Sequence, residues 1–227
     1  MAEEEKKAGL LPDSDQLEAY AKRIQEFVRG NQKTMIMAAS ALLLLAVIIS
    51  GVIYFQKKAE EKAQALLGQA ITQIEAASRS NSADTRYAEI KPRLKKLIDQ
   101  YGGTDAGKAA RLKYADLCYQ TGDYEKATDM YQAALASYSN DPDLRPLILN
   151  GLGYAQEKRG EYARAADSFK RIVNEEDAVL KDQALFNLGR IYGRMGEAEK
   201  QQEAYEQLVS DYPDSMYYQL AKEKLAA

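Results

Sequence analysis

The chain has 227 residues with 31 basic and 34 acidic side chains, one cysteine and no histidine. A single cysteine excludes an internal disulfide, and the lack of histidine excludes a histidine metal site and a histidine-based catalytic triad. Residues 56–227 carry 25 basic and 27 acidic side chains, a net charge of −2, so charge gives no reason to expect a nucleic-acid partner.

The N-terminal region is predicted to contain one short amphipathic helix. Residues 1–12, with the charge run Glu3 to Lys7, are expected to be disordered, and Asp13 to Asp15 offer helix caps. An apolar stripe at helical spacing follows and ends near Gly30; it consists of Leu17, Tyr20, Ile24, Phe27 and Val28. Two interpretations remain open: the stripe lies in a membrane interface, or it docks on a membrane partner.

Residues 34–55 are predicted to form a transmembrane helix. The 21 residues from Met35 to Phe55 carry no formal charge, and a helix of that length covers roughly 30 Å, the thickness of a bilayer's hydrocarbon core. The run is longer than the apolar part of a signal peptide and is apolar on every face, unlike a helix in a soluble core. Four basic residues precede it and three follow within about 15 residues, which slightly favours a cytoplasmic N-terminus. We therefore expect a cytoplasmic tail over residues 1–33 and a domain over residues 56–227 on the far side.

The region after the span is predicted to be all-α and repetitive. Helices are expected over residues 56–78, over residues 84–100 with an irregularity at Pro92, and over residues 216–225 as a terminal cap. Three segments between them align, with turn glycines at positions 122, 160 and 196. Each segment has a small residue where two helices would cross and an aromatic residue that would fill the adjacent gap. The small residues are Ala115, Gly153 and Gly189, and the aromatic residues are Tyr131, Phe169 and Tyr205.

This pattern resembles the tetratricopeptide repeat (TPR), a helix-turn-helix unit with a period of about 34 residues. The resemblance implies an α-solenoid of stacked hairpins whose concave face, lined by the first helix of each unit, binds proteins. Lys158, Arg190 and Arg194 would be placed to receive a carboxylate of a bound polypeptide. The candidate protein-binding residues are Leu112, Asp116, Tyr119, Asn150, Tyr154, Lys158, Phe186, Arg190 and Arg194.

A second resemblance covers the tail, the span and its exit. The segments 15–19, 31–33 and 63–70, with Tyr54 and Lys58 between them, are similar to the ancillary SecYEG translocon subunit family (YfgM-like). That resemblance implies a single-pass protein of the bacterial inner membrane, with a cytoplasmic N-terminus and a periplasmic TPR domain. Its expected partners are the SecYEG-type translocon, periplasmic chaperones and emerging client proteins. The alternative is a TPR adaptor of another envelope complex, in cell division or secretion.

Catalytic chemistry is not expected from this sequence. The glycines sit at repeat turns and helix crossings and form no phosphate-binding loop, and the acidic clusters Glu60-Glu61 and Glu175 to Asp177 are typical of solvated helix faces. Cys118 occupies a repeat position that faces the hairpin interior, so it is interpreted as a small buried apolar residue. We therefore predict a binding protein with no enzymatic activity, cofactor, metal or small-molecule substrate.

Overall fold

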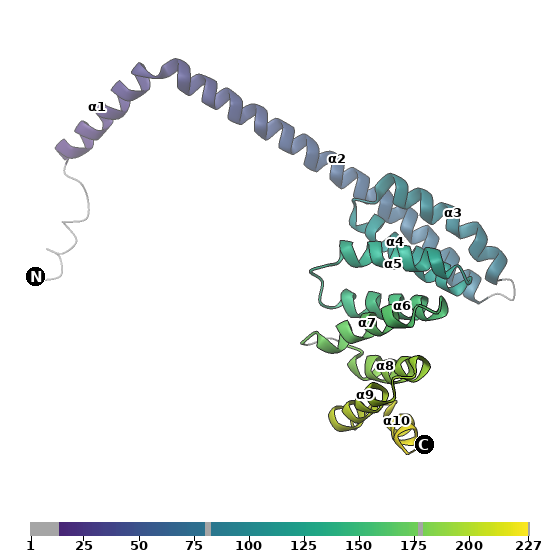
Figure 1. Cartoon of the computed structure of the whole chain (residues 1–227). Coiled ribbons are helices and arrows are strands. Elements are labelled where there is room, and N and C mark those ends of the chain that lie inside the picture. The colour runs from purple at the N-terminus through teal and green to yellow at the C-terminus, as the bar shows by residue number, and fades with distance from the viewer. Residues whose placement is uncertain (1–13, 80–82, 177–178, 227) are drawn as a thin grey trace, which may run out of the picture. The chain divides into compact units, whose positions relative to one another are not determined.

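The computed structural model describes residues 14–79, 83–176 and 179–226, and every regular element in these ranges is an α-helix. This confirms the predicted all-α fold class. The charge run Glu3 to Lys7 and the cap residue Asp13 lie outside the described residues. The helices, labelled in Figure 1, are α1 (Ser14–Gly30), α2 (Gln32–Ser78), α3 (Ala83–Tyr101), α4 (Asp105–Gln120), α5 (Tyr124–Ser137), α6 (Leu144–Lys158), α7 (Tyr162–Asn174), α8 (Lys181–Met195), α9 (Ala198–Asp211) and α10 (Tyr218–Leu225).

The chain divides into two compact units, Met1–Lys57 and Lys58–Ala227. The first unit holds α1 and the apolar part of α2. Asn31 alone separates these helices, and its backbone N–H donates to the Phe27 carbonyl at 3.1 Å. Among the described residues, α2 is the one helix long and apolar enough to cross a bilayer; its most apolar window has a mean hydropathy of 2.7 and no side chain buried within the protein.

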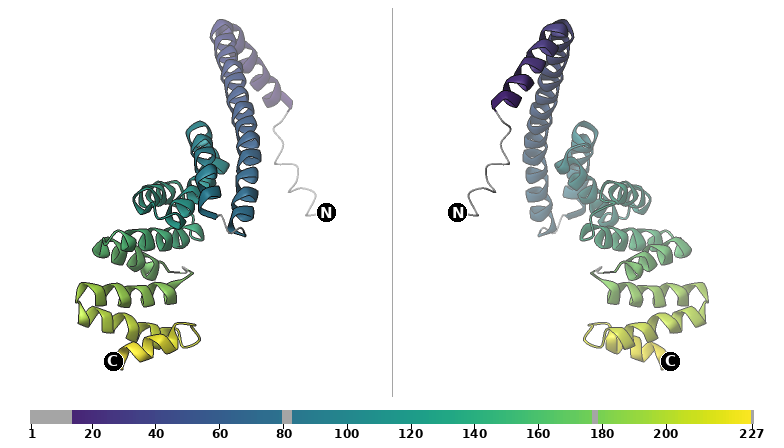
Figure 2. Two further views of the ribbon diagram at one scale, coloured as in Figure 1. Left: turned by 90° about the vertical axis from the view of Figure 1, so that its right-hand side faces the viewer. Right: turned by 90° about the vertical axis from the view of Figure 1, so that its left-hand side faces the viewer.

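The second unit is a stack of helices, each packed on the next in chain order from α3 to α10 (Figures 1 and 2). Short turns join α4 to α5, α6 to α7 and α8 to α9, and these three hairpins are the three predicted repeats. The turn glycines Gly122, Gly160 and Gly196 have φ values of 78°, 76° and 76°. A side chain at this left-handed φ is strained, so glycine is the residue that lets each hairpin reverse within a few residues.

The two remaining predicted glycines lie at tight helix crossings. A Cβ atom built on Gly153 of α6 would lie 2.7 Å from Cζ of Phe169 on α7. A Cβ on Gly189 of α8 would lie 2.5 Å from Cε1 of Tyr205 on α9. In both hairpins the aromatic ring therefore occupies the space that the absent side chain leaves, as the repeat pattern predicted.

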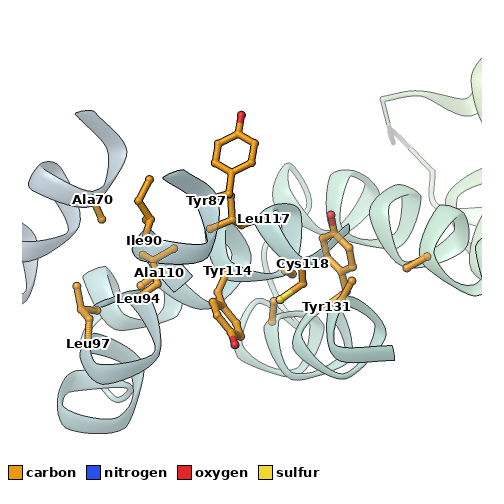
Figure 3. Close-up of a cluster of buried hydrophobic side chains, with 14 of the residues drawn as sticks. Ala70, Tyr87, Ile90, Leu94, Leu97, Ala110, Tyr114, Leu117, Cys118 and Tyr131 are labelled. Atoms are coloured by element: carbon orange, nitrogen blue, oxygen red, sulfur yellow. The ribbon is translucent and has the colours of Figure 1, made fainter. Parts of the chain in front are cut away.

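The largest apolar cluster joins the outer part of α2 to α3, α4 and α5 (Figure 3). Ala70 of α2 and Leu94 of α3 belong to it, together with Tyr114 and Cys118 of α4. Cys118 is fully buried, and burial raises the pKa of its thiol because a thiolate is poorly solvated there. The structure thus confirms the interpretation of Cys118 as a packed core residue.

Burial of Tyr114 predicts a loss of stability at alkaline pH. Its hydroxyl is removed from water, which raises the pKa from 10.0 to about 12. Below pH 10 the folded and unfolded chains both hold this proton, whereas between pH 10 and about 12 only the folded chain does. The free energy of unfolding should therefore fall as the pH rises through that window. Urea denaturation at stepped pH should show a smaller alkaline loss for Tyr114→Phe; an unchanged loss would contradict this assignment.

The carboxylate of Glu60 connects the outer part of α2 to the repeats by hydrogen bonds. Oε2 of Glu60 accepts the backbone N–H of Asp105 at 2.7 Å, and Oε1 accepts that of Ala106 at 3.1 Å. These two N–H groups begin α4 and have no partner inside their own helix. The positive end of the helix dipole lies at the same place, so an anionic side chain is stabilised there. Because Glu60 precedes α4 by 45 residues, this contact fixes α2 against the stack.

Replacing Glu60 with alanine should lower the free energy of unfolding by about 1–2 kcal/mol, the range for losing a charged cap. The neighbouring Glu61 is exposed, so Glu61→Ala is the matched control and should change little. Urea denaturation of the three proteins measures the difference. Equal midpoints for Glu60→Ala and Glu61→Ala would show that the contact contributes nothing.

Candidate functional site

All nine candidate residues lie on the first helix of a hairpin. We call the surface formed by these helices the first-helix face. The residues are Leu112, Asp116 and Tyr119 on α4; Asn150, Tyr154 and Lys158 on α6; and Phe186, Arg190 and Arg194 on α8. Within each helix they recur every three or four residues and therefore share one side.

Polar contacts join α6 to α8 on this face. The hydroxyl oxygen of Tyr154 accepts hydrogen bonds from Nε2 of Gln183 at 3.0 Å and from Nδ2 of Asn187 at 2.9 Å. The ring of Tyr154 also packs edge-to-face on Phe169, with centroids 5.5 Å apart. Tyr154 is therefore held by both its polar and its apolar parts, which fixes its position on the face.

The carboxylate expected at the basic residues is supplied from within the chain. Glu157 of α6 accepts a bidentate hydrogen bond from Arg190 of α8, with Nη2 to Oε2 at 2.7 Å and a second contact from Nη1 to Oε1. Arg190 also donates to Oδ1 of Asn187 at 3.1 Å. Because Glu157 is only 10% exposed, this pair is shielded from water, and the hydrogen bonds raise the pKa of Arg190 further.

Arg194 and Lys158 remain accessible beside this pair. Nε of Arg194 lies 3.7 Å from Oε1 of Glu157, but its side chain is 55% exposed. Its guanidinium also lies over the ring of Tyr162, 5.9 Å from the centroid. Lys158 is exposed, and no ion pair is recorded for it among the described residues. Of the three predicted carboxylate receptors, Lys158 and Arg194 are thus available to a partner, whereas Arg190 is occupied.

The candidate residues of α4 turn towards their own hairpin. Oδ1 of Asp116 accepts the hydroxyl of Tyr131 at 2.7 Å, and burial raises the pKa of this carboxyl group. Tyr119 packs edge-to-face on Tyr124, with centroids 5.5 Å apart. Leu112 is partly buried against the apolar cluster of α2 to α5. These three side chains are partly buried and pack within the first repeat.

The remaining two candidates are Phe186 on α8 and Asn150 on α6. Phe186 stacks on Tyr217 with centroids 5.0 Å apart, so it closes the end of the stack against α10. Asn150 lies one turn before Tyr154, and its Oδ1 atom is shielded from solvent without a hydrogen-bond donor among the described residues. An unpaired buried acceptor costs about 1–3 kcal/mol.

The structure also shows a groove that the sequence did not indicate. It has a volume of about 670 Å³ and is lined by α5 and α7, the second helices of two neighbouring hairpins, and by α6. Buried Gln156 lies in its floor and accepts from Oγ of Ser168 at 2.7 Å. The position four residues before the turn glycine is Gln156 here but Tyr192 in the next repeat. The lining residues are Gln132, Leu135, Ala136, Ser139, Arg145, Leu152, Gln156, Ala163, Arg164, Asp167, Ser168 and Arg171.

Within the described ranges, no group of three or more Cys, Asp or Glu side chains is placed to hold a metal ion. The contacts of the first-helix face are hydrogen bonds, one shielded ion pair and aromatic packing. Such a surface presents cations, hydroxyl and amide groups on a rigid frame, and it can bind a polypeptide by charge and by hydrogen bonding.

The comparison with protein families agrees with the repeat geometry. Residues 25–227 match the family described as the tetratricopeptide repeat-like domain. The chain belongs to that family. The family accounts for the glycine turns, the close crossings and the aromatic fillers described above.

One relative in Treponema pallidum (strain Nichols), described as a TPR repeat-containing protein, is 28% identical over 118 residues. The match covers 52% of this chain and 49% of the relative, so the chain spans about half the length of that protein. A tetratricopeptide repeat protein from Parabacteroides merdae superposes with a TM-score of 0.59 at 14% identity, over 73% of this chain and 59% of that one. TPR-like repeats of a putative kinesin light chain from Podosopora anserina give 0.57 at 16% identity, over 70% and 84%. At these identities the structures show a shared fold and nothing about partners.

Proposed function

We propose that this protein is a membrane-anchored scaffold that binds other polypeptides on its first-helix face. The observation that carries the proposal is the rigid frame around Tyr154, Glu157 and Arg190, which leaves Lys158 and Arg194 exposed beside it. Two exposed cations next to the fixed ring of Tyr154 suit an acidic or amide-rich segment of a partner. Pre-ordered groups lose little conformational entropy on binding, which favours recognition over flexibility.

The anchor in this proposal is the apolar part of α2. Its 21 uncharged residues are long enough to cross a bilayer, and none of the side chains in its most apolar window is buried by the part of the chain that the structure describes. With the basic residues biased to the N-terminal side, the N-terminus is cytoplasmic and the repeats are periplasmic. Protease treatment of spheroplasts tests this topology: the repeats should be digested while the tail is protected, and the reverse pattern would overturn the orientation.

The partner we propose is a SecYEG-type translocon of the bacterial inner membrane, with periplasmic chaperones or emerging proteins as further contacts. Support comes from the resemblance of the tail, the span and its exit to the ancillary translocon subunits. A single span would tether the repeat domain to the same membrane that holds the channel. This assignment concerns the partner only, and the scaffold function does not depend on it.

Crosslinking in intact membranes followed by affinity purification of the full-length protein tests the partner and the face together. SecY-type channel subunits should be recovered with the wild-type protein. The double variant Lys158→Glu with Arg194→Gln should lose them, because it removes both cations from the face. Both side chains are exposed, so their replacement leaves the fold intact. Lys170→Glu, at an exposed position on the second helix α7, is the matched control and should retain them. Recovery of only division or secretion proteins would contradict the translocon assignment.

A further inference from the structure

Helix α1 carries an apolar stripe that no described part of the protein covers. Leu17, Tyr20, Ile24 and Phe27 are 54%, 59%, 63% and 65% exposed. They recur at spacings of three, four and three residues, so they form one continuous line along the helix. Four large apolar side chains in a row on a helix of 17 residues make an interaction surface rather than scattered exposed positions.

The helix itself indicates that this stripe is covered in the native state. Most helices in proteins gain their stability by packing one apolar face rather than from intrinsic helix propensity. At about 100° per residue, the acidic residues Asp15, Glu18 and Glu26 all fall on the side away from the stripe. The charges therefore leave the stripe free to enter an apolar environment while the opposite side stays in water.

The position of α1 in the chain identifies that environment. Only Asn31 separates α1 from α2, and the uncharged run of α2 begins at Met35. The stripe is thus tethered within a few residues of the proposed membrane span. The aromatic rings of Tyr20 and Phe27 suit the boundary between headgroups and acyl chains, and Arg23 beside the stripe suits anionic headgroups.

We propose that α1 lies flat in the interface of the same membrane, with its apolar stripe against the acyl chains and its acidic side in water. The proposal rests on the membrane anchor of the proposed function, but it holds for either orientation of the span. The alternatives are that a second copy of this chain or a separate membrane protein packs against the stripe. Tryptophan fluorescence distinguishes lipid from these two protein partners.

The chain contains no tryptophan, so one introduced tryptophan reports a single position. Three full-length variants are compared: Leu17→Trp on the stripe, Ala19→Trp on the opposite side of α1, and Ile48→Trp within the span. Each is placed in nanodiscs that hold one chain, made from anionic phosphatidylglycerol and from phosphatidylcholine brominated near the carbonyl end of its acyl chains. If α1 continued straight into water, position 17 would lie about 27 Å from the start of the apolar run.

We expect strong bromine quenching of Leu17→Trp and Ile48→Trp. Ala19→Trp, on the opposite side of α1, is the control and should show little quenching. Quenching of Ile48→Trp alone would overturn the interface position of α1 and leave the anchor standing. Loss of quenching for Ile48→Trp would overturn the anchor and the proposal with it. Absence of bromine quenching for Leu17→Trp in one-chain discs, with a blue-shifted emission only in discs holding two chains or in native membranes, would assign the stripe to a protein partner instead.

Discussion

Replacing Gly153 with leucine should lower the free energy of unfolding by about 3 kcal/mol or more. The first added atom would already lie 2.7 Å from Cζ and 2.8 Å from Cε1 of Phe169, and Phe169 is fully buried. The ring has no free volume to move into, because Ile172 and Leu149 are fully buried in the same cluster. The two helices of the second hairpin must therefore separate, which exposes the apolar surface between them. Urea denaturation of the repeat-bearing protein measures the loss.

Gly68→Leu is the matched control for this substitution. Gly68 lies in the helical interior of α2, and a Cβ there meets nothing within 4 Å. Leucine has a higher helix propensity than glycine, so this variant should be as stable as the wild type or slightly more stable. If Gly153→Leu and Gly68→Leu denature at the same urea concentration, the close crossing of α6 and α7 is wrong.

Reversing the charge of Arg190 should cost a comparable amount, about 3–5 kcal/mol, because it leaves Glu157 shielded from water without its partner. The introduced carboxylate would also face Glu157 across the former hydrogen bonds. Lys158→Glu on the same face is exposed and should shift stability by no more than about 0.5 kcal/mol. Thermal denaturation of Arg190→Glu and Lys158→Glu compares the two.

The double variant Glu157→Arg with Arg190→Glu separates a specific pair from a general effect of charge. It restores one cation and one carboxylate at the same two positions, so it should recover part of the stability lost in Arg190→Glu. A double variant less stable than both single variants would contradict the paired geometry. Arg190 is unsuitable for testing partner binding, because its replacement changes the fold as well as the surface.

The helices and turns could be predicted because their signals are local. Apolar periodicity and the glycines at 122, 160 and 196 predicted three hairpins, and all three glycines have the left-handed φ that a tight reversal requires. The small residue and the aromatic residue of each repeat predicted the crossings of Gly153 with Phe169 and Gly189 with Tyr205. The helix over residues 84–100, with Pro92 inside it, corresponds to α3.

The contacts between distant residues could not be predicted in the same way. Glu60 was interpreted as part of a solvated charged face, yet it caps α4 from 45 residues away. No local pattern distinguishes Glu157, although its position one turn before Gly160 places it opposite Arg190, 33 residues later. Leu180, the residue that precedes α8, has a φ of 70°, which no sequence signal indicates for leucine. Such features depend on which helix faces meet, and a single sequence does not contain that information.

We propose that a membrane-tethered repeat domain binds polypeptides through its first-helix face. The most direct measurement is photocrosslinking in native membranes, with benzoylphenylalanine introduced in the full-length protein at position 158 on α6 or at position 170 on α7. We predict a covalent adduct with another polypeptide, in the membrane fraction, from position 158 and none from position 170. Adducts from position 170 alone, or from neither position, would contradict the claim.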